Sequence, residues 1–138
     1  MTRHIILSAL AAVFFAATPA LAVDFTPQSD GVIDFDMPSG NMCCSLIEDH
    51  PDGPILSCTR IAPKYWIVTM QQDGQYTLYK NPGEVPGCGY GKALGNIFEY
   101  GETWNKAGFS CTSATNGVRC FANGRGFRLS RAGLKKYN

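Results

Sequence analysis

The six cysteines of this 138-residue chain constrain its fold more than any other feature. They are Cys43, Cys44, Cys58, Cys88, Cys111 and Cys120. An even number of cysteines in a small exported chain predicts disulfides, here three. A zinc site is the alternative, but no C-x-x-C pair occurs and His50 is the only histidine after residue 22. We therefore expect a small domain held together by three disulfides, with no metal or other cofactor.

The first 22 residues have the features of a cleaved secretory signal peptide. Arg3 gives a basic start, an apolar run extends from Ile5 to Phe15, and Ala20-Leu21-Ala22 fits the A-x-A rule of signal peptidase. The apolar run is shorter than the ~20 residues of a membrane span. No cysteine follows the cleavage position, so a lipoprotein anchor is not expected. The prediction is a single domain of residues 23–138, free of the membrane, in the periplasm or outside the cell.

Short apolar segments separated by turn residues predict an all-β domain. VIDFDM alternates apolar and acidic residues, as a half-buried strand does. MCCSLI and PILSCTRI flank the turn-rich EDHPDG and are typical of a hairpin. KYWIVTM and YTLYK flank Asp73-Gly74, a strong hairpin turn signal. Residues 106–130 indicate another hairpin followed by a further strand.

The end of the chain is the one place where the sequence suggests a helix. RAGLKKY, residues 131–137, is interpreted as a short helical turn, with Ser130 available as its cap. The expected fold is therefore a small antiparallel β-barrel or sandwich, stapled by disulfides and closed by this short C-terminal helical turn.

Strand geometry predicts how the first hairpin is crosslinked. Neighbouring residues on a strand point to opposite faces, so Cys43 and Cys44 need different partners. Pairing Cys44 with Cys58 sets Leu46 opposite Leu56 and places all four side chains on one face. That register suits a buried apolar surface.

The second hairpin has two candidate registers. A two-residue loop at Asn116-Gly117 leaves Cys111 and Cys120 a diagonal ~7–8 Å apart, beyond the ~7 Å limit for the Cα atoms of a disulfide. A four-residue loop from Ala114 to Gly117 sets the two cysteines opposite each other, with Gly117 in a left-handed conformation. By elimination Cys43 pairs with Cys88, which ties the Gly-rich loop 81–96 to the first hairpin.

Charge is unevenly distributed along the chain. Residues 23–52 carry seven acidic residues and no Lys or Arg, whereas residues 103–138 carry seven basic residues and no acid. The acids are Asp24, Asp30, Asp34, Asp36, Glu48, Asp49 and Asp52, and the bases are Lys106, Arg119, Arg125, Arg128, Arg131, Lys135 and Lys136. Such asymmetry marks a binding face, or two ends that pack together and neutralise each other.

The basic C-terminal third supplies the candidate binding residues. These are Arg125, Arg128, Arg131, Lys135, Lys136 and Trp104. Phe127 and Leu129 are expected to point inward and Arg128 outward, while Trp104 and Tyr100 either line a recognition surface or pack in the core. Such a patch suits the phosphates or sulfates of an anionic envelope polymer, or a negatively charged protein such as a hydrolase to be inhibited. Nucleic acid is not an expected partner outside the cytoplasm.

The motifs of common hydrolases are missing. Neither a G-x-S-x-G elbow nor an S-x-x-K pair occurs, and His50, beside a proline in a turn, has the setting of a solvated loop residue. Asp34 and Asp36 share a strand face but form an incomplete shell for a cation such as calcium. We expect no catalytic residue and a non-catalytic binding module. The alternatives are a small envelope hydrolase that uses carboxylates such as Glu99 and Glu102, and a structural component of the envelope.

The spacing of several residues resembles a family of exported bacterial domains of unknown function, with the pattern PSGNxxC, then YGxxWxxGxFxCxS, GxxC and GxGFxLSR. The matching positions are Pro38, Ser39, Gly40, Asn41, Cys44, Tyr100, Gly101, Trp104, Gly108, Phe109, Cys111, Ser113, Gly117, Cys120, Gly124, Gly126, Phe127, Leu129, Ser130 and Arg131. Members of that family often carry His where this chain has Arg125, which argues against a catalytic histidine there. The resemblance implies secretion and a disulfide-stapled domain, and it implies no activity.

Overall fold

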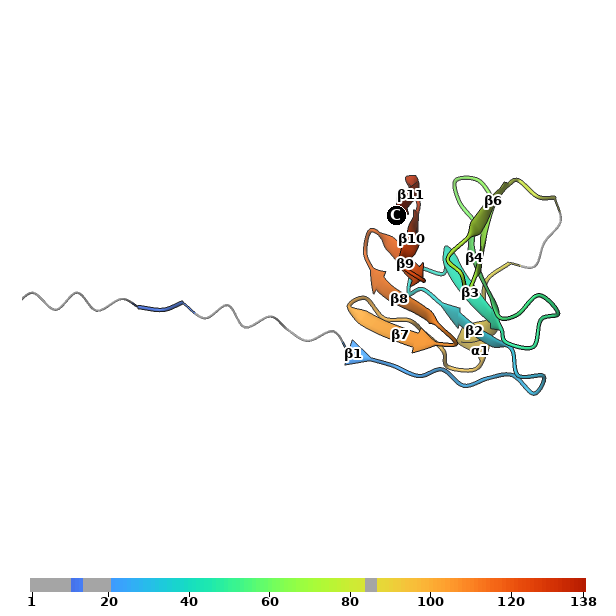
Figure 1. Cartoon of the computed structure of the whole chain (residues 1–138), viewed down its shortest axis with the longest axis horizontal. Helices are drawn as coiled ribbons and strands as arrows, with labels where there is room; N and C mark the ends of the chain where they lie inside the picture. The colour runs from blue at the N-terminus through green and yellow to red at the C-terminus, as the bar shows by residue number, and fades with distance from the viewer. Residues whose placement is uncertain (1–10, 14–20, 84–86) are drawn as a thin grey trace, which may run out of the picture.

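The computed structural model describes residues 11–13, 21–83 and 87–138 (Figure 1). Most of the expected signal peptide, residues 1–10 and 14–20, lies outside the described residues. Within the described part of the chain, no helix has the length and apolar character needed to cross a membrane.

Two β-sheets stack face to face in an all-β sandwich (Figure 1). The five-stranded sheet follows the chain order β2 (Ile33–Asp36), β3 (Met42–Ile47), β4 (Ile55–Arg60), β5 (Trp66–Gln71) and β6 (Tyr76–Lys80). The six-stranded sheet has the order β1 (Leu21–Ala22), β7 (Glu102–Lys106), β8 (Phe109–Ala114), β9 (Gly117–Ala122), β10 (Arg125–Ser130) and β11 (Gly133–Tyr137). Every pair is antiparallel except β1 with β7. Neither sheet closes on itself, so the all-β prediction is confirmed as a sandwich and not as a barrel.

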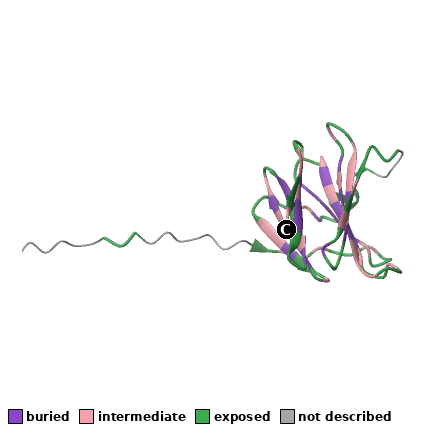
Figure 2. Cartoon of the chain, turned by 45° about the horizontal axis from the view of Figure 1, so that its top comes forward, coloured by how far each residue is buried: buried purple, intermediate pink, exposed green. Residues whose placement is uncertain are grey.

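The core lies between the two sheets, where Figure 2 shows the buried residues of both. Alternate residues of β3 and β4 are buried, as the period of two in a strand requires. Phe35, Leu46, Leu56 and Phe127 are fully buried in this core. Burying each such side chain stabilises the fold by roughly 1.5–3 kcal/mol.

Trp104 belongs to the core and not to a binding surface, which makes it a wrong choice among the candidate binding residues. Its side chain is 1 % exposed. Its ring centroid lies 4.9 Å from that of Phe35 and 6.0 Å from that of Phe25. Position 104 falls on the inward face of β7, opposite Cys111. The apolar indole therefore packs in the part of the core that also contains the rings of Phe25 and Phe35.

The three disulfides join the predicted pairs, Cys43–Cys88, Cys44–Cys58 and Cys111–Cys120. Cys44 lies directly opposite Cys58, and Leu46 lies opposite Leu56, as the register argument requires. In the second hairpin Cys111 lies opposite Cys120, and Gly117 has a φ of 124°. Ala114 and Gly117 still pair with each other there, so the turn itself is tighter than expected.

The predicted C-terminal helical turn is wrong, because residues 133–137 form strand β11. β11 pairs with β10 along its whole length, from Ser130 opposite Gly133 to Gly126 opposite Tyr137. Gly133 has a φ of 146°, a conformation far from that of a helix. The unpaired edge of β10 offers this segment hydrogen bonds that a single helical turn cannot supply.

Three further elements were not expected, and one of them is β1, whose two residues belong to the predicted signal peptide. The Gly-rich loop contains a one-turn helix, α1 (Tyr90–Ala93), and the YGETWNK segment contains β7. β2 also differs from the half-buried strand that its alternation predicts, because all four of its residues are buried. Its two acidic side chains are covered because each one accepts hydrogen bonds from neighbouring segments.

Candidate functional site

Three turns from distant parts of the chain meet around a cavity of about 390 Å³ at one end of the sandwich. The β2–β3 turn contributes Ser39 and Asn41, and the β8–β9 turn contributes Asn116. Arg128 on β10 and Arg131 in the β10–β11 turn complete the charged part of the wall. We call this space the arginine cavity.

The side chain of Asn41 fixes the β2–β3 turn, because its amide group pairs with the backbone of Ala62 as one strand residue pairs with another. The Asn41 amide nitrogen Nδ2 donates to the Ala62 carbonyl at 2.9 Å, and the Ala62 N–H donates to Asn41 Oδ1 at 2.8 Å. The Ile61 N–H also donates to the Asn41 carbonyl at 2.9 Å. This side of the cavity is therefore held by three hydrogen bonds to the segment that follows β4.

Arg60, a residue that sequence reasoning missed, fixes the backbone of Ser130 and Arg131, two residues that line the cavity. Its side chain is 2 % exposed, and its Nη1 donates to the carbonyls of Ser130 at 3.2 Å and Arg131 at 3.3 Å. Its Nε donates to the Lys64 carbonyl at 3.1 Å. Burial, followed by the positive charge of Arg131, lowers the pKa of the Arg60 guanidinium. One buried cation thus ties β4 of one sheet to the β10–β11 turn of the other.

Three basic residues form a straight row across the outer face of the six-stranded sheet. Arg128 lies directly opposite Arg119 on β9 and directly opposite Lys135 on β11. We call these three residues the basic row. Like charges placed opposite each other on adjacent strands destabilise a sheet. The fold therefore keeps an arrangement of charges that its own stability does not favour.

Aromatic rings lie next to the basic row. The ring centroids of Phe121 and Tyr137 are 5.4 Å apart, and the Arg119 guanidinium lies 4.9 Å from the first and 4.5 Å from the second. Gly126 stands between them in the sheet register, and a Cβ there would lie 2.4 Å from the Phe121 ring. The missing side chain of Gly126 leaves the space in which the two rings meet.

The other predicted binding residues are dispersed. Arg131 lines the arginine cavity beside Arg128, as described above. Lys136 lies opposite Phe127, so it points to the other side of the sheet from Lys135. Arg125 begins β10 near the β5–β6 turn, since its Cβ would be 2.9 Å from a Cβ on Gly74. The predicted binding residues therefore do not form one patch. Arg128 and Lys135 lie together in the basic row with Arg119, which was predicted as a basic residue of the C-terminal third but not as a binding residue.

The acidic and basic thirds of the chain neutralise each other only to a small extent, because few ion pairs in the described part of the chain join them. Among the described residues Lys106 and Glu48 form an ion pair at 3.8 Å. This pair does join the two thirds, but it does not involve the basic row. Arg128 also has a buried Nε without a hydrogen-bond partner in the described structure. None of the described ion pairs therefore neutralises the basic row.

The carboxylates proposed for a hydrolase are engaged in a turn. The Glu99 N–H donates to Glu102 Oε1 at 2.5 Å, and the Glu102 N–H donates to the Glu99 carbonyl at 3.1 Å. Neither residue lines the arginine cavity, although Tyr100 between them does. His50 accepts a hydrogen bond at Nδ1 from the Asp52 N–H at 3.2 Å, as a turn residue does. These positions do not assemble an acid–base pair around a shared cavity.

No family model, curated protein or solved structure matches the chain. The site is therefore interpreted from its own chemistry. Six residues of the sequence pattern given above line the arginine cavity: Ser39, Asn41, Tyr100, Gly117, Ser130 and Arg131. They come from four separate segments of the chain, and the fold brings them to one place.

Proposed function

We propose that this protein is an exported, non-catalytic binding module that holds anionic groups of a cell-envelope polymer on the basic row and in the arginine cavity. The three disulfides support export, because such bonds form and persist in oxidising compartments. The polymer is defined here by its chemistry, which is a chain that bears sulfates, phosphates or carboxylates.

The setting of Arg128 is the observation that carries this proposal. Arg128 belongs both to the basic row and to the wall of the arginine cavity, and its buried Nε has no acceptor in the described structure. A buried donor without an acceptor is costly, and so are like charges on adjacent strands. An oxyanion seated beside Arg128 would relieve both costs, because a guanidinium binds phosphate and carboxylate oxygens in a fork.

The extent of the surface favours a polymer over a single small ion. Adjacent strands are ~4.8 Å apart, so the basic row presents three cations along a line of roughly 10 Å. Phe121 and Tyr137 add an apolar surface beside these charges. A polysaccharide offers the matching combination of spaced anions and apolar ring faces.

Paired variants test the proposal with heparin as the anionic probe. Arg119→Ala with Arg128→Ala removes two charges from the basic row, and Arg125→Ala with Lys136→Ala removes two charges elsewhere on β10 and β11. The first variant should bind heparin at least tenfold more weakly and with a smaller salt dependence, without a loss of melting temperature. The second should keep most of the affinity. Equal losses in the two variants would mean that only net charge matters, and the proposal would be wrong.

A further inference from the structure

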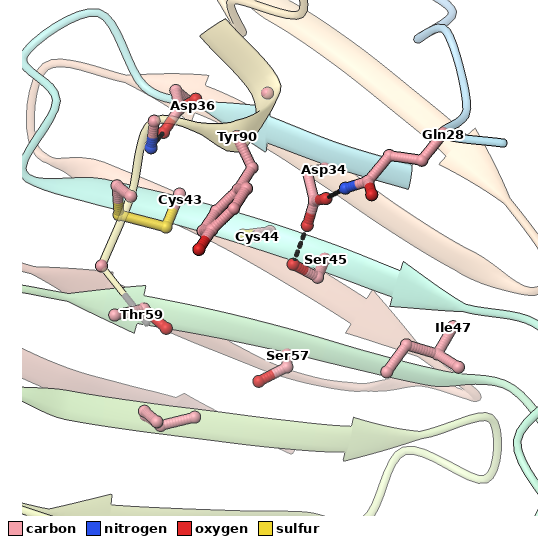
Figure 3. Close-up of a pocket in the computed structure, with 15 residues that line it drawn as sticks. Gln28, Asp34, Asp36, Cys43, Cys44, Ser45, Ile47, Ser57, Thr59 and Tyr90 are labelled. Carbon is pink, nitrogen blue, oxygen red and sulfur yellow. Dashed lines mark hydrogen bonds between the residues drawn. A yellow bond between two sulfur atoms is a disulfide. The ribbon is translucent and has the colours of Figure 1, made fainter. Parts of the chain in front are cut away.

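A second cavity, of about 380 Å³, lies on the outer face of the five-stranded sheet (Figure 3). β2, β3, β4 and β5 form its floor, and the segment from Gly87 to Gly91 forms one wall. The Cys43–Cys88 disulfide attaches that wall to β3. Gly91 lets the wall approach closely, because a Cβ there would lie 2.5 Å from the Phe35 Cα. We call this space the carboxylate cavity.

Asp34 lies in the carboxylate cavity with only 9 % of its surface exposed. Its two oxygens accept hydrogen bonds from the Ser45 hydroxyl and from the Gln28 amide, as Figure 3 shows. Asp36 also lines the cavity and accepts from the backbone N–H groups of Gly89 at 2.8 Å and Lys92 at 2.5 Å. All four donors are neutral groups, so they orient the two carboxylates without cancelling their charge.

The described lining of the carboxylate cavity contains no Lys, Arg or His. The basic row, by contrast, consists of cations and lies on the six-stranded sheet. Two carboxylates that are nearly buried and have no counter-cation among the described residues make the interior of the cavity electronegative, and the low-dielectric surroundings strengthen that field. The chemistry that complements such a space carries a positive charge.

The rest of the lining indicates what kind of cation fits. Tyr90 is 58 % exposed, and Figure 3 shows its ring between the Cys43–Cys88 disulfide and Asp34. An exposed aromatic ring beside a carboxylate is a favourable environment for an ammonium group. The Ser57 hydroxyl offers a further acceptor, and Ile47 and Ile67 provide an apolar surface. This combination suits a charged nitrogen carried on a short hydrocarbon chain.

A metal ion fits the carboxylate cavity less well. Asp36, Cys43 and Cys88 are close enough to share an ion, but the two sulfurs are bonded to each other and offer no thiolate. The Asp34 and Asp36 oxygens are each oriented by N–H or O–H donors, which occupy part of their acceptor capacity. The volume of the cavity also exceeds what a bare ion needs and lies within the range of small-molecule sites.

We propose that the carboxylate cavity binds a small organic cation, a primary ammonium on a short aliphatic chain. The ammonium donates hydrogen bonds to the Asp34 carboxylate and lies against the Tyr90 ring, while the chain packs on Ile47 and Ile67. This site is separate from the basic row and does not depend on the function proposed for it.

Calorimetric titration of the exported protein with n-butylammonium tests this proposal, with n-butanol as a neutral probe of the same shape. We expect a saturable site for the ammonium and none for the alcohol. Asp34→Asn should weaken ammonium binding at least tenfold. Asp49→Asn, which removes the same charge from an exposed position outside the cavity, should change the affinity less than twofold.

Tyr90 provides a second variant should Asp34→Asn fail to fold. Because the ring is largely exposed, Tyr90→Ala should fold normally and bind the ammonium several-fold more weakly, whereas Tyr90→Phe should bind it as the parent does. Binding of butanol as tight as that of butylammonium would overturn the proposal, as would equal losses in Asp34→Asn and Asp49→Asn. Arg119→Ala with Arg128→Ala should leave ammonium binding unchanged, so this site can fail or stand independently of heparin binding.

Discussion

Cys43 and Cys44 are adjacent in the chain, yet their disulfides lie on opposite faces of β3. Cys44 is buried in the core and bonds to Cys58 on the neighbouring strand, whereas Cys43 lines the outer cavity and bonds to Cys88. One dipeptide thus crosslinks the interior of a hairpin and also secures a distant loop on its exterior.

This difference predicts different consequences for the two bonds. Cys43→Ser with Cys88→Ser should leave the core intact but loosen the wall of the carboxylate cavity, while lowering stability by about 2–5 kcal/mol as loss of a native disulfide does. Amide hydrogen exchange should then quicken at Gly89 and Lys92, whose N–H groups donate to Asp36. Cys111→Ser with Cys120→Ser is the matched control, because its bond lies in the other sheet and should not alter exchange at these two amides. Unchanged protection in the first variant would show that the wall holds without its disulfide.

Arg60 should be among the most sensitive positions in the fold. Its guanidinium donates to three backbone carbonyls and lies 3.8 Å from the Trp66 ring centroid. Each hydrogen bond that involves a charged group contributes about 1.5–3 kcal/mol, so Arg60→Ala should lower the free energy of unfolding by about 3 kcal/mol or more. Arg60→Lys should also destabilise, because an ammonium cannot reproduce the planar fork. Urea denaturation measures both, and a loss below 1 kcal/mol in Arg60→Ala would contradict this role.

Stability should fall in alkaline solution because of Tyr76. Burial raises the pKa of its phenol above the ordinary value of 10.0. A group with a raised pKa stabilises the folded state at every pH below its unfolded value, and that stabilisation is lost as the pH rises through the folded value. The free energy of unfolding should therefore decline above pH 10, and Tyr76→Phe should decline less steeply. Tyr79→Phe, a change at an exposed position, serves as the control. Parallel pH curves for the parent and Tyr76→Phe would count against this assignment.

Export should produce a protein that begins at Val23, because Ala20-Leu21-Ala22 fits the signal peptidase rule. The loss of β1 should cost little stability, since it has two residues and Leu21 is 70 % exposed. The Val23 nitrogen donates to the Thr103 carbonyl at 2.8 Å, and this contact is retained by a chain that starts there. N-terminal sequencing of the exported protein checks the position. A product that starts elsewhere, or one that keeps residues 1–22, would disagree with it.

The hairpins were predictable because local patterns determine them. The alternation in β3 and β4 fixes which residues face the core, and the cysteines then leave one register in which Cys44 meets Cys58. The same reasoning gave the correct pairing of Cys111 with Cys120. The β10–β11 hairpin is a local element that was nevertheless missed, because its short second strand was interpreted as a helical turn. α1 was missed because it packs where Gly91 meets β2, a strand distant in the sequence.

The candidate site was predictable only in part. The outward direction of Arg128 followed from the inward direction of Phe127 and Leu129. Its grouping with Lys135 did not, because that alignment depends on β11, which was expected to be helical. The register of β9 with β10, which sets Arg119 opposite Arg128, was not predicted either. No sequence pattern pointed to Arg60, because a basic residue at the end of a strand is usually exposed. The carbonyls to which it donates, those of Ser130 and Arg131, come close to it only in the folded chain.

β11 is the last strand of the six-stranded sheet, so one row of its backbone N–H and C=O groups has no partner strand within the sheet. An open edge of this kind is a template on which another chain can add a strand and begin to aggregate. Lys135 and Lys136 are consecutive and therefore extend to opposite sides of this edge. Charged side chains on an edge strand, lysine above all, disfavour the addition of a further strand. Lys136, which lies apart from the basic row, thus helps to keep one copy of the protein from joining its sheet to another.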